Sequence, residues 1–378
     1  DFILPAPVGG LNKRDPIISM RQTDAMEMDN YMPLQNSVEL REGYEKYALI
    51  GGFEKTKKVE TLVSYHTAQI SRMIAIFGGK AYRVTKESAI EYENVVFSKS
   101  RCQTVQYQGR LYLMNGVDVP KVYFVDENDT EHFENWAFEG ENLPENQIIS
   151  AAVSHEFLWF VEKNSTRAWV SSVAGNIAGT LEAFDVAQVL KWGGCLQAVF
   201  NWTVDGGQGI DDYTCLLSSE GEVLIYKGYN PNDADNWTLV GSYKLGKPIG
   251  YQCTMAYQGD VVIICEDGYV PLSKALSANN AGTSTIAFSD KIRGLVSERT
   301  GLYKNLEGWQ SLIYGKKGYA VFNVPVANSF EQHVININTG AWCRWTDIRA
   351  FCWCLHDDVL YFGSDNNVFK FGGTYSDN

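Results

Sequence analysis

Short apolar strands recur along this chain in pairs that turn at a polar or glycine-containing tip. The clearest pair is 110–114 with 121–125, where RLYLM and KVYFV flank a loop. Six further pairs share the pattern: 73–77 with 81–84, 157–161 with 167–170, 213–217 with 222–226, 260–265 with 269–272, 319–323 with 333–338 and 358–362 with 368–371. A strand unit repeated about every 40–50 residues is typical of a β-propeller. We therefore expect an all-β fold of about seven small blades.

The repeat occupies residues 39–372, and residues 373–378 form a short C-terminal tail. Its last unit has only three strands, at 349–355, 358–362 and 368–371. Residues 39–49 contain a strand pair or one long strand around Gly43. This N-terminal strand can supply the missing fourth strand, because mixing first and last strands removes the free edges of an open array. We expect the propeller to be closed in this way.

Residues 1–38 do not fit the repeat and predict an extended N-terminal arm for docking. Two prolines and a double glycine open the arm, and Ala25, Met26 and Met28 indicate a short helix or turn within 20–32. Such an arm cannot fold alone, so it lies on the propeller or on a neighbouring subunit. Its candidate interface residues are Leu4, Pro5, Pro7, Met20, Met26 and Tyr31.

A second departure from the repeat is a helical insertion at about 273–305. Ser289 and Asp290 are positioned to cap a helix over 289–300, in which Ile292, Leu295 and Val296 recur at helical spacing. A helix that projects from a propeller rim is suited to contact a partner subunit. Its candidate interface residues are Asp290, Arg293 and Arg299.

Tryptophan recurs in the expected outer strands. The examples are Trp136, Trp237, and the pair Trp342 and Trp345. Large aromatic side chains dominate packing between sheets, so we expect these residues to fill the spaces between adjacent blades.

Charge and cysteine content narrow the possible partners. The 378 residues include 32 Lys and Arg against 45 Asp and Glu, a net charge of −13. Such a chain repels polyanions, which argues against tight binding to a nucleic-acid backbone, although the acidity also serves solubility.

The eight cysteines form no C-x-x-C pair, which predicts buried free thiols in a reducing compartment. No signal peptide or apolar membrane-spanning run is present, so we expect synthesis in a cytosol.

Motifs for catalysis or cofactor binding are missing. The five histidines are scattered singly, and neither a G-x-S-x-G nor a phosphate-loop motif occurs. The glycine-rich residues 206–209 precede a strand rather than a helix, so they lack the helix N-terminus that holds a phosphate. Acidic residues at 211–212, 357–358 and 230–235 are typical of turns. We expect no enzyme activity, no metal and no cofactor.

Three segments together resemble the tail nozzle proteins of short-tailed bacteriophages, also called tail hub or packaged-DNA stabilisation proteins. The first runs from GGLNKRDP at 9–16 through DAMEMDNYMP at 24–33 to VELREGY at 38–44. The second contains GEVLIYKG at 221–228 and GKPIG at 246–250, and the third is SDKIR at 289–293. The resemblance extends over nearly the whole chain.

This resemblance implies a structural virion protein that forms a homo-hexameric ring below the portal and adaptor. The ring would line the DNA exit channel, retain the packaged genome until ejection, and contact the adaptor and the tail fibre or tip proteins. DNA would pass without tight or specific binding, and no membrane would be involved. Family members often continue into a further β domain, so a chain ending at Asn378 is either a short form or truncated. The protein would be made in the host bacterial cytoplasm.

A glycan-binding or glycan-processing propeller is the alternative, because propellers host many functions. Trp159, Trp202 or Trp353 would then form a platform for sugar rings at the mouth of the propeller.

Overall fold

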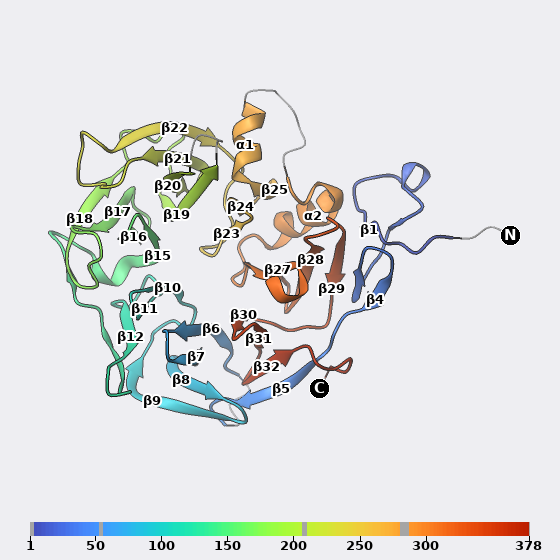
Figure 1. Cartoon of the computed structure of the whole chain (residues 1–378), viewed down its shortest axis with the longest axis horizontal. Coiled ribbons are helices and arrows are strands. Elements are labelled where there is room, and N and C mark those ends of the chain that lie inside the picture. Colours follow the sequence, from blue (N-terminus) through green and yellow to red (C-terminus); the bar gives the residue numbers. More distant parts are fainter. Residues whose placement is uncertain (1–3, 53–55, 206–209, 280–286, 378) are drawn as a thin grey trace. The chain divides into compact units, whose positions relative to one another are not determined.

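The computed structural model describes residues 4–52, 56–205, 210–279 and 287–377. The fold is all-β, with 50% of residues in strands and 8% in helices. Its sheets have a six-blade β-propeller arrangement (Figure 1). The glycine-rich residues 206–209 lie outside the described residues.

The chain divides into two compact units, which are described separately. Unit 1 comprises Asp1–Ser64, Ser71–Glu91 and Thr285–Asn378, and unit 2 comprises Tyr65–Ile70 and Tyr92–Ser284. The sheet with strand order β6-β7-β8-β9 is built from β6 (Val59–His66), β7 (Ser71–Phe77), β8 (Lys80–Thr85) and β9 (Ser88–Val96).

Unit 2 contains four sheets made of consecutive strands. Their members are β10 (Gln103–Tyr107), β11 (Arg110–Met114), β12 (Lys121–Val125) and β13 (Glu131–Asn135); β15 (Ile148–Ser154), β16 (Phe157–Glu162), β17 (Arg167–Ser171) and β18 (Gly179–Asp185), with the short β14 (Phe138–Glu139) beside β18; β19 (Leu196–Asp205), β20 (Ile210–Ser218), β21 (Glu222–Lys227) and β22 (Thr238–Lys244); and β23 (Thr254–Tyr257), β24 (Asp260–Cys265) and β25 (Gly268–Pro271). The last sheet has three strands, and the other three sheets of unit 2 have four or five.

Unit 1 joins N-terminal and C-terminal strands in the same sheets. The largest has the order β2-β1-β29-β28-β27-β26, from β2 (Asp24–Ala25), β1 (Gly10–Leu11), β29 (Trp342–Trp345), β28 (Ser329–Asn336), β27 (Tyr319–Val326) and β26 (Gln310–Tyr314). Another has the order β30-β31-β32-β5, from β30 (Cys352–His356), β31 (Val359–Gly363), β32 (Asn367–Phe371) and β5 (Tyr44–Leu49). The third pairs β3 (Tyr31–Pro33) with β4 (Val38–Leu40).

The repeat read from the sequence corresponds to real strand pairing. All seven expected pairs are antiparallel neighbours: β7–β8, β11–β12, β16–β17, β20–β21, β24–β25, β27–β28 and β31–β32. They are recognisable because each combines two apolar runs with a local turn, so the pairing needs no distant information.

Strand β5 supplies a fourth strand to the C-terminal sheet. It pairs antiparallel with β32, with Tyr44 opposite Phe371 and Leu49 opposite Asn367. Only the second half of the expected strand 39–49 takes part, because β4 pairs with β3 instead. Gly43 separates the two strands, and a Cβ there would lie 2.1 Å from the carbonyl oxygen of Ser376. The close approach of these backbones therefore requires glycine.

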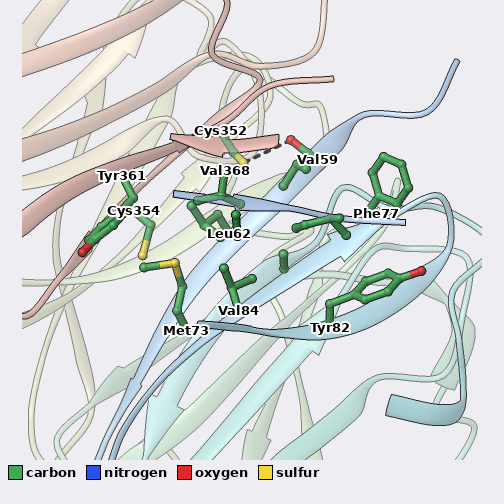
Figure 2. Packing of buried hydrophobic residues seen from close by; sticks show 13 residues of the cluster. Val59, Leu62, Met73, Phe77, Tyr82, Val84, Cys352, Cys354, Tyr361 and Val368 are labelled. Carbon is green, nitrogen blue, oxygen red and sulfur yellow. Dashed lines mark hydrogen bonds between the residues drawn. The ribbon is translucent and has the colours of Figure 1, made fainter. Parts of the chain in front are cut away.

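A core of unit 1 lies between the β30-β31-β32-β5 sheet and the strands β6 to β8 (Figure 2). Val59, Met73 and Val368 are at most 1% exposed there. The thiol of Cys352 donates to the carbonyl oxygen of Val59 at 3.2 Å. Burial of each large apolar side chain contributes about 1.5–3 kcal/mol. All eight cysteines of the chain are free thiols and seven are buried, as the sequence predicted.

Trp136, Trp237 and Trp345 fill spaces between neighbouring sheets, as predicted, although Trp136 follows β13 and Trp237 precedes β22. Trp342 packs instead on Phe322 of its own sheet and on Phe288. Trp136 packs edge-on against Phe160 of the next sheet, with ring centroids 4.9 Å apart. Trp237 lies between Tyr226 and Trp159, which belong to two different sheets. In unit 1, Trp345 stacks on Phe371 of β32 at 4.8 Å.

Helices depart from the sequence prediction in three places. The expected helix over 289–300 is a 3-10 turn, Asp290–Ile292, followed by α2 (Arg293–Tyr303), and Ser289 makes no side-chain capping hydrogen bond to that turn. A second helix, α1 (Leu272–Asn279), was not anticipated, because its start reads as the end of strand β25. The Met-containing stretch 20–32 is not helical: a 3-10 turn, η1 (Ile17–Ser19), precedes the strands β2 and β3.

Trp237 gives a test of packing between sheets. It is 8% exposed, and replacing a buried tryptophan by alanine leaves a large cavity. We expect Trp237→Ala to lower the free energy of unfolding by about 3–5 kcal/mol in urea denaturation. Trp192 is 47% exposed, so Trp192→Ala is the matched control and should change stability by no more than about 0.5 kcal/mol. Equal effects of the two substitutions would contradict this packing role.

Candidate functional site

The tryptophans expected to form a sugar platform are not available to a ligand. Trp159, Trp202 and Trp353 are 0%, 6% and 1% exposed. The indole of Trp202 donates to Asp260 at 3.1 Å, and that of Trp353 donates to Asn323 at 2.9 Å. This part of the glycan-binding alternative is wrong, because the three rings are core residues.

Two of the three acidic clusters singled out in the sequence serve turns, whereas Asp211 and Asp212 lie within strand β20, opposite Val204 and Thr203. Asp357 and Asp358 have φ of 49° and 58° between β30 and β31, as a tight hairpin requires. In the loop 230–235, the side chains of Asn230 and Asp233 accept hydrogen bonds from the backbone of Asn232 and Asp235. These oxygens satisfy their own loop, in agreement with the predicted turns.

The N-terminal arm is part of a sheet of its own chain. We call residues 4–43 the N-terminal segment. Its strand β1 pairs in parallel with β2 on one side and, through Gly10, with Trp342 of β29 on the other. Gly10 has φ of 82°, and a Cβ there would lie 2.5 Å from the carbonyl oxygen of Trp342. Only glycine therefore allows this approach to the edge of β29.

Farther along, the segment contacts β29 again. The amide of Arg344 donates to the carbonyl of Met28 at 2.9 Å, and the amide of Asn30 donates to the carbonyl of Arg344 at 2.7 Å. Met28 and Met32 are 4% and 3% exposed. The segment thus adds both hydrogen bonds and buried apolar side chains to this sheet.

Three ion pairs fix the N-terminal segment to distant parts of unit 1. Lys291 binds Asp24 at 2.7 Å, and Arg344 binds Asp29 through two nitrogens at 2.6 and 2.8 Å. Arg41, only 5% exposed, binds both carboxylate oxygens of Asp377 at 2.6 and 2.9 Å. Two-point guanidinium–carboxylate pairs set geometry as well as adding stability, so the segment is held in one orientation.

The ion pair between Arg344 and Asp29 adjoins a buried cluster of charged side chains. Glu331 accepts from Arg299 at 2.7 Å and from His333 at 3.0 Å, and it lies 3.5 Å from Arg344. Burial would raise the pKa of Glu331, but the hydrogen bonds from His333 and Arg299 outweigh it and lower the pKa to about 2. Burial lowers the pKa of His333, with Glu331 acting in the opposite direction. The cluster connects α2, β28 and β29 to the N-terminal segment.

Residues 12–23 leave the sheet after β1 and return to it at β2, and we call them the basic loop. Its base is fixed by Arg14, which binds Asp290 at 2.6 Å and both oxygens of Asp15 at 2.8 and 2.9 Å. These bonds raise the pKa of Arg14 and lower that of Asp15. At its tip, η1 carries Ile17 and Ile18, which are 70% and 98% exposed. A rigid turn therefore presents two large apolar side chains to solvent.

The residues predicted as interface candidates fall into different environments. Leu4, Met26 and Tyr31 are 74%, 47% and 50% exposed, Pro5 is exposed, and Pro7 and Met20 are half-buried. The structure brings Asp290 to the N-terminal segment through Arg14, and Arg293, with its side chain 61% exposed, lies 3.8 Å from Asp290. Arg299 is separate from these, because its side chain is 16% exposed and binds Glu331.

Several residues that fix the N-terminal segment, or are exposed on it, were not identified from the sequence. The partners Asp29 and Arg344 are 315 residues apart in sequence, so no local pattern indicates them. Ile17 and Ile18 could have been found: two β-branched apolar residues follow Pro16 in a charged stretch with no apolar periodicity to bury them.

The buried carboxylate of Glu331 predicts a specific acid sensitivity. A carboxylate whose pKa is lowered in the folded state stabilises the protein above its ordinary pKa of 4.5, and this contribution is lost as pH falls towards 2. Glu331→Gln removes this titration. The stability advantage of the unsubstituted protein over Glu331→Gln should therefore shrink below pH 4.5, by up to about 1.4 kcal/mol per pH unit.

Urea midpoints at pH 5, 4 and 3 measure this difference. Glu298→Gln is the control, because it removes an exposed carboxylate that also binds Arg299 but keeps Glu331. A difference between the unsubstituted protein and Glu331→Gln that stays constant from pH 5 to 3 would contradict the role of the Glu331 charge.

No helix in the described part of the chain is long and apolar enough to cross a membrane. No protein-family model matches the chain, and no curated protein matches its sequence.

Proposed function

We propose that this chain is a structural virion protein that forms the tail nozzle or hub of a short-tailed bacteriophage. The observation that carries the proposal is an apolar surface on a fixed N-terminal segment. Of the 17 large hydrophobic side chains exposed in the described residues, six lie within residues 4–40, about a tenth of the chain: Leu4, Ile17, Ile18, Met26, Tyr31 and Leu40. Exposed apolar side chains that gather in one segment mark a protein–protein contact.

Contacts between the motif segments support the resemblance. The stretches GGLNKRDP and SDKIR are about 280 residues apart in sequence, but they touch in unit 1. The amide of Lys13 donates to the carbonyl of Lys291 at 2.9 Å, and the Lys291 ammonium donates to the carbonyl of Gly9. Both motifs thus contribute to one structural module.

A closed propeller of about seven blades is also part of the proposal. In this interpretation the three-stranded sheet β23–β25 counts as a reduced blade in addition to the six sheets of four or more strands. The pairing of β5 with β32 would be the closure, since it combines the first repeat strand with the last three. Such a scaffold needs no chemistry of its own to act as a channel wall.

The proposed assembly is a homo-hexamer that contacts the adaptor and the tail fibre or tip proteins within the virion. The N-terminal segment and the neighbouring Asp290 and Arg293 would supply subunit or adaptor contacts. The net charge of −13 suits a wall past which DNA moves without tight binding. Arg299 would support assembly only indirectly, by stabilising unit 1, because its guanidinium is already paired with Glu331.

Assembly in solution and in particles tests this function. We expect the purified protein to sediment as a defined ring of about six copies, and a labelled antibody to mark the tail of phage particles in electron micrographs. A protein that remains monomeric, is absent from particles and hydrolyses a reporter glycan would overturn the proposal.

A further inference from the structure

A small pocket in unit 1 is formed in part by the N-terminal segment and is lined by apolar, aromatic and charged side chains. Leu40, Trp345, Phe371 and Tyr375 contribute to its wall, and Glu39 and Glu42 also line it. The cavity volume of about 60 Å³ would hold about four to six water-sized groups. An isoleucine side chain, with four carbon atoms, matches that space.

The pocket has one uncompensated charge among its lining residues. Arg41 is paired with Asp377, and Lys317 is paired with Glu42 at 3.0 Å. Glu39 is exposed and has no ion pair among the described residues, where its carboxylate accepts only from the hydroxyl of Ser37 at 3.3 Å. The pocket therefore combines apolar and aromatic side chains with charged ones, and among these charges Glu39 is the free anion.

The basic loop has the complementary features. Arg14 is engaged by Asp15 and Asp290, but the exposed Lys13 and Arg21 have no ion pair in the part of the chain that the structure describes. Between them, Ile18 is 98% exposed on a turn that is fixed at its base. A fully exposed apolar side chain between two free cations fits a pocket that has apolar side chains and a free anion.

We propose that Ile18 of one copy of this chain inserts into the pocket of a second copy, with Lys13 and Arg21 facing Glu39. In Figure 1 the blue coil of η1 lies beyond β1 and apart from β4, whose Leu40 lines the pocket. We call Ile18 the knob. The knob and the pocket lie at different places on the molecule, so their pairing is a head-to-tail contact. Such a contact repeats around a ring when its rotation closes. The inference rests on the proposed function, because it names the contact that joins the copies.

Two substitutions separate the knob from the pocket. Ile18→Asp places a charge at the knob, and Leu40→Asp places one in the pocket wall. Both side chains are exposed in one copy, 98% and 46%, so each variant should keep the melting temperature of the unsubstituted protein. We expect each to weaken self-association about 30-fold or more, as measured by sedimentation velocity over a concentration series. Leu302→Asp, on an exposed site of α2, is the matched control and should assemble normally.

Mixing the two variants tests the head-to-tail geometry directly. An Ile18→Asp copy retains a pocket and a Leu40→Asp copy retains a knob, so an equimolar mixture should form dimers and nothing larger. If the unsubstituted protein assembles and both variants assemble equally well, this inference is wrong and the proposed function stands. If the unsubstituted protein stays monomeric at every concentration, both are wrong. Failure of the mixture to form dimers, when each variant alone is monomeric, would also overturn the head-to-tail contact.

Discussion

The exposed surface of the N-terminal segment depends on one interaction, the contact of this segment with Arg344 at the edge of β29. The backbone of Arg344 donates to Met28 and accepts from Asn30, while its guanidinium binds Asp29. The same guanidinium lies 3.5 Å from Glu331. Removing a charged group from water costs several kcal/mol, and here two carboxylates offset that cost. One residue therefore fixes both the backbone and the charges of the segment.

This arrangement explains how an arm without a core of its own can present a defined surface. Parallel pairing of β1, the buried Met28 and Met32, and the ion pairs at Asp24 and Arg41 hold it at several points. A surface that is already ordered loses less conformational entropy on binding than a flexible tail would. The exposed apolar residues of the segment are thus prepared for a partner without being part of the fold.

The sequence predicted the repeating strands because their information is local. Each pair carries its own apolar alternation and turn, and the outer-strand tryptophans repeat with it. Strands β1 and β2 have two residues each, too few to show a periodicity, and the partner of β1 on β29 is more than 300 residues away. Of the short helix or turn expected within 20–32, a turn is present at 22–23 and no helix forms. Asn30 has φ of 63°, which is incompatible with a helix, and Met28 and Met32 are buried outside any helix.

Hydrogen exchange of the segment's backbone amides tests the central claim most directly. The amides of Asn12 and Asn30 donate to Ala25 and Arg344, so they should exchange about as slowly as the hydrogen-bonded amides of β27 and β28. Exchange of Asn12 and Asn30 at the rate of an unstructured peptide, while β27 and β28 remain protected, would show that the arm is not fixed to the sheet and would contradict the account.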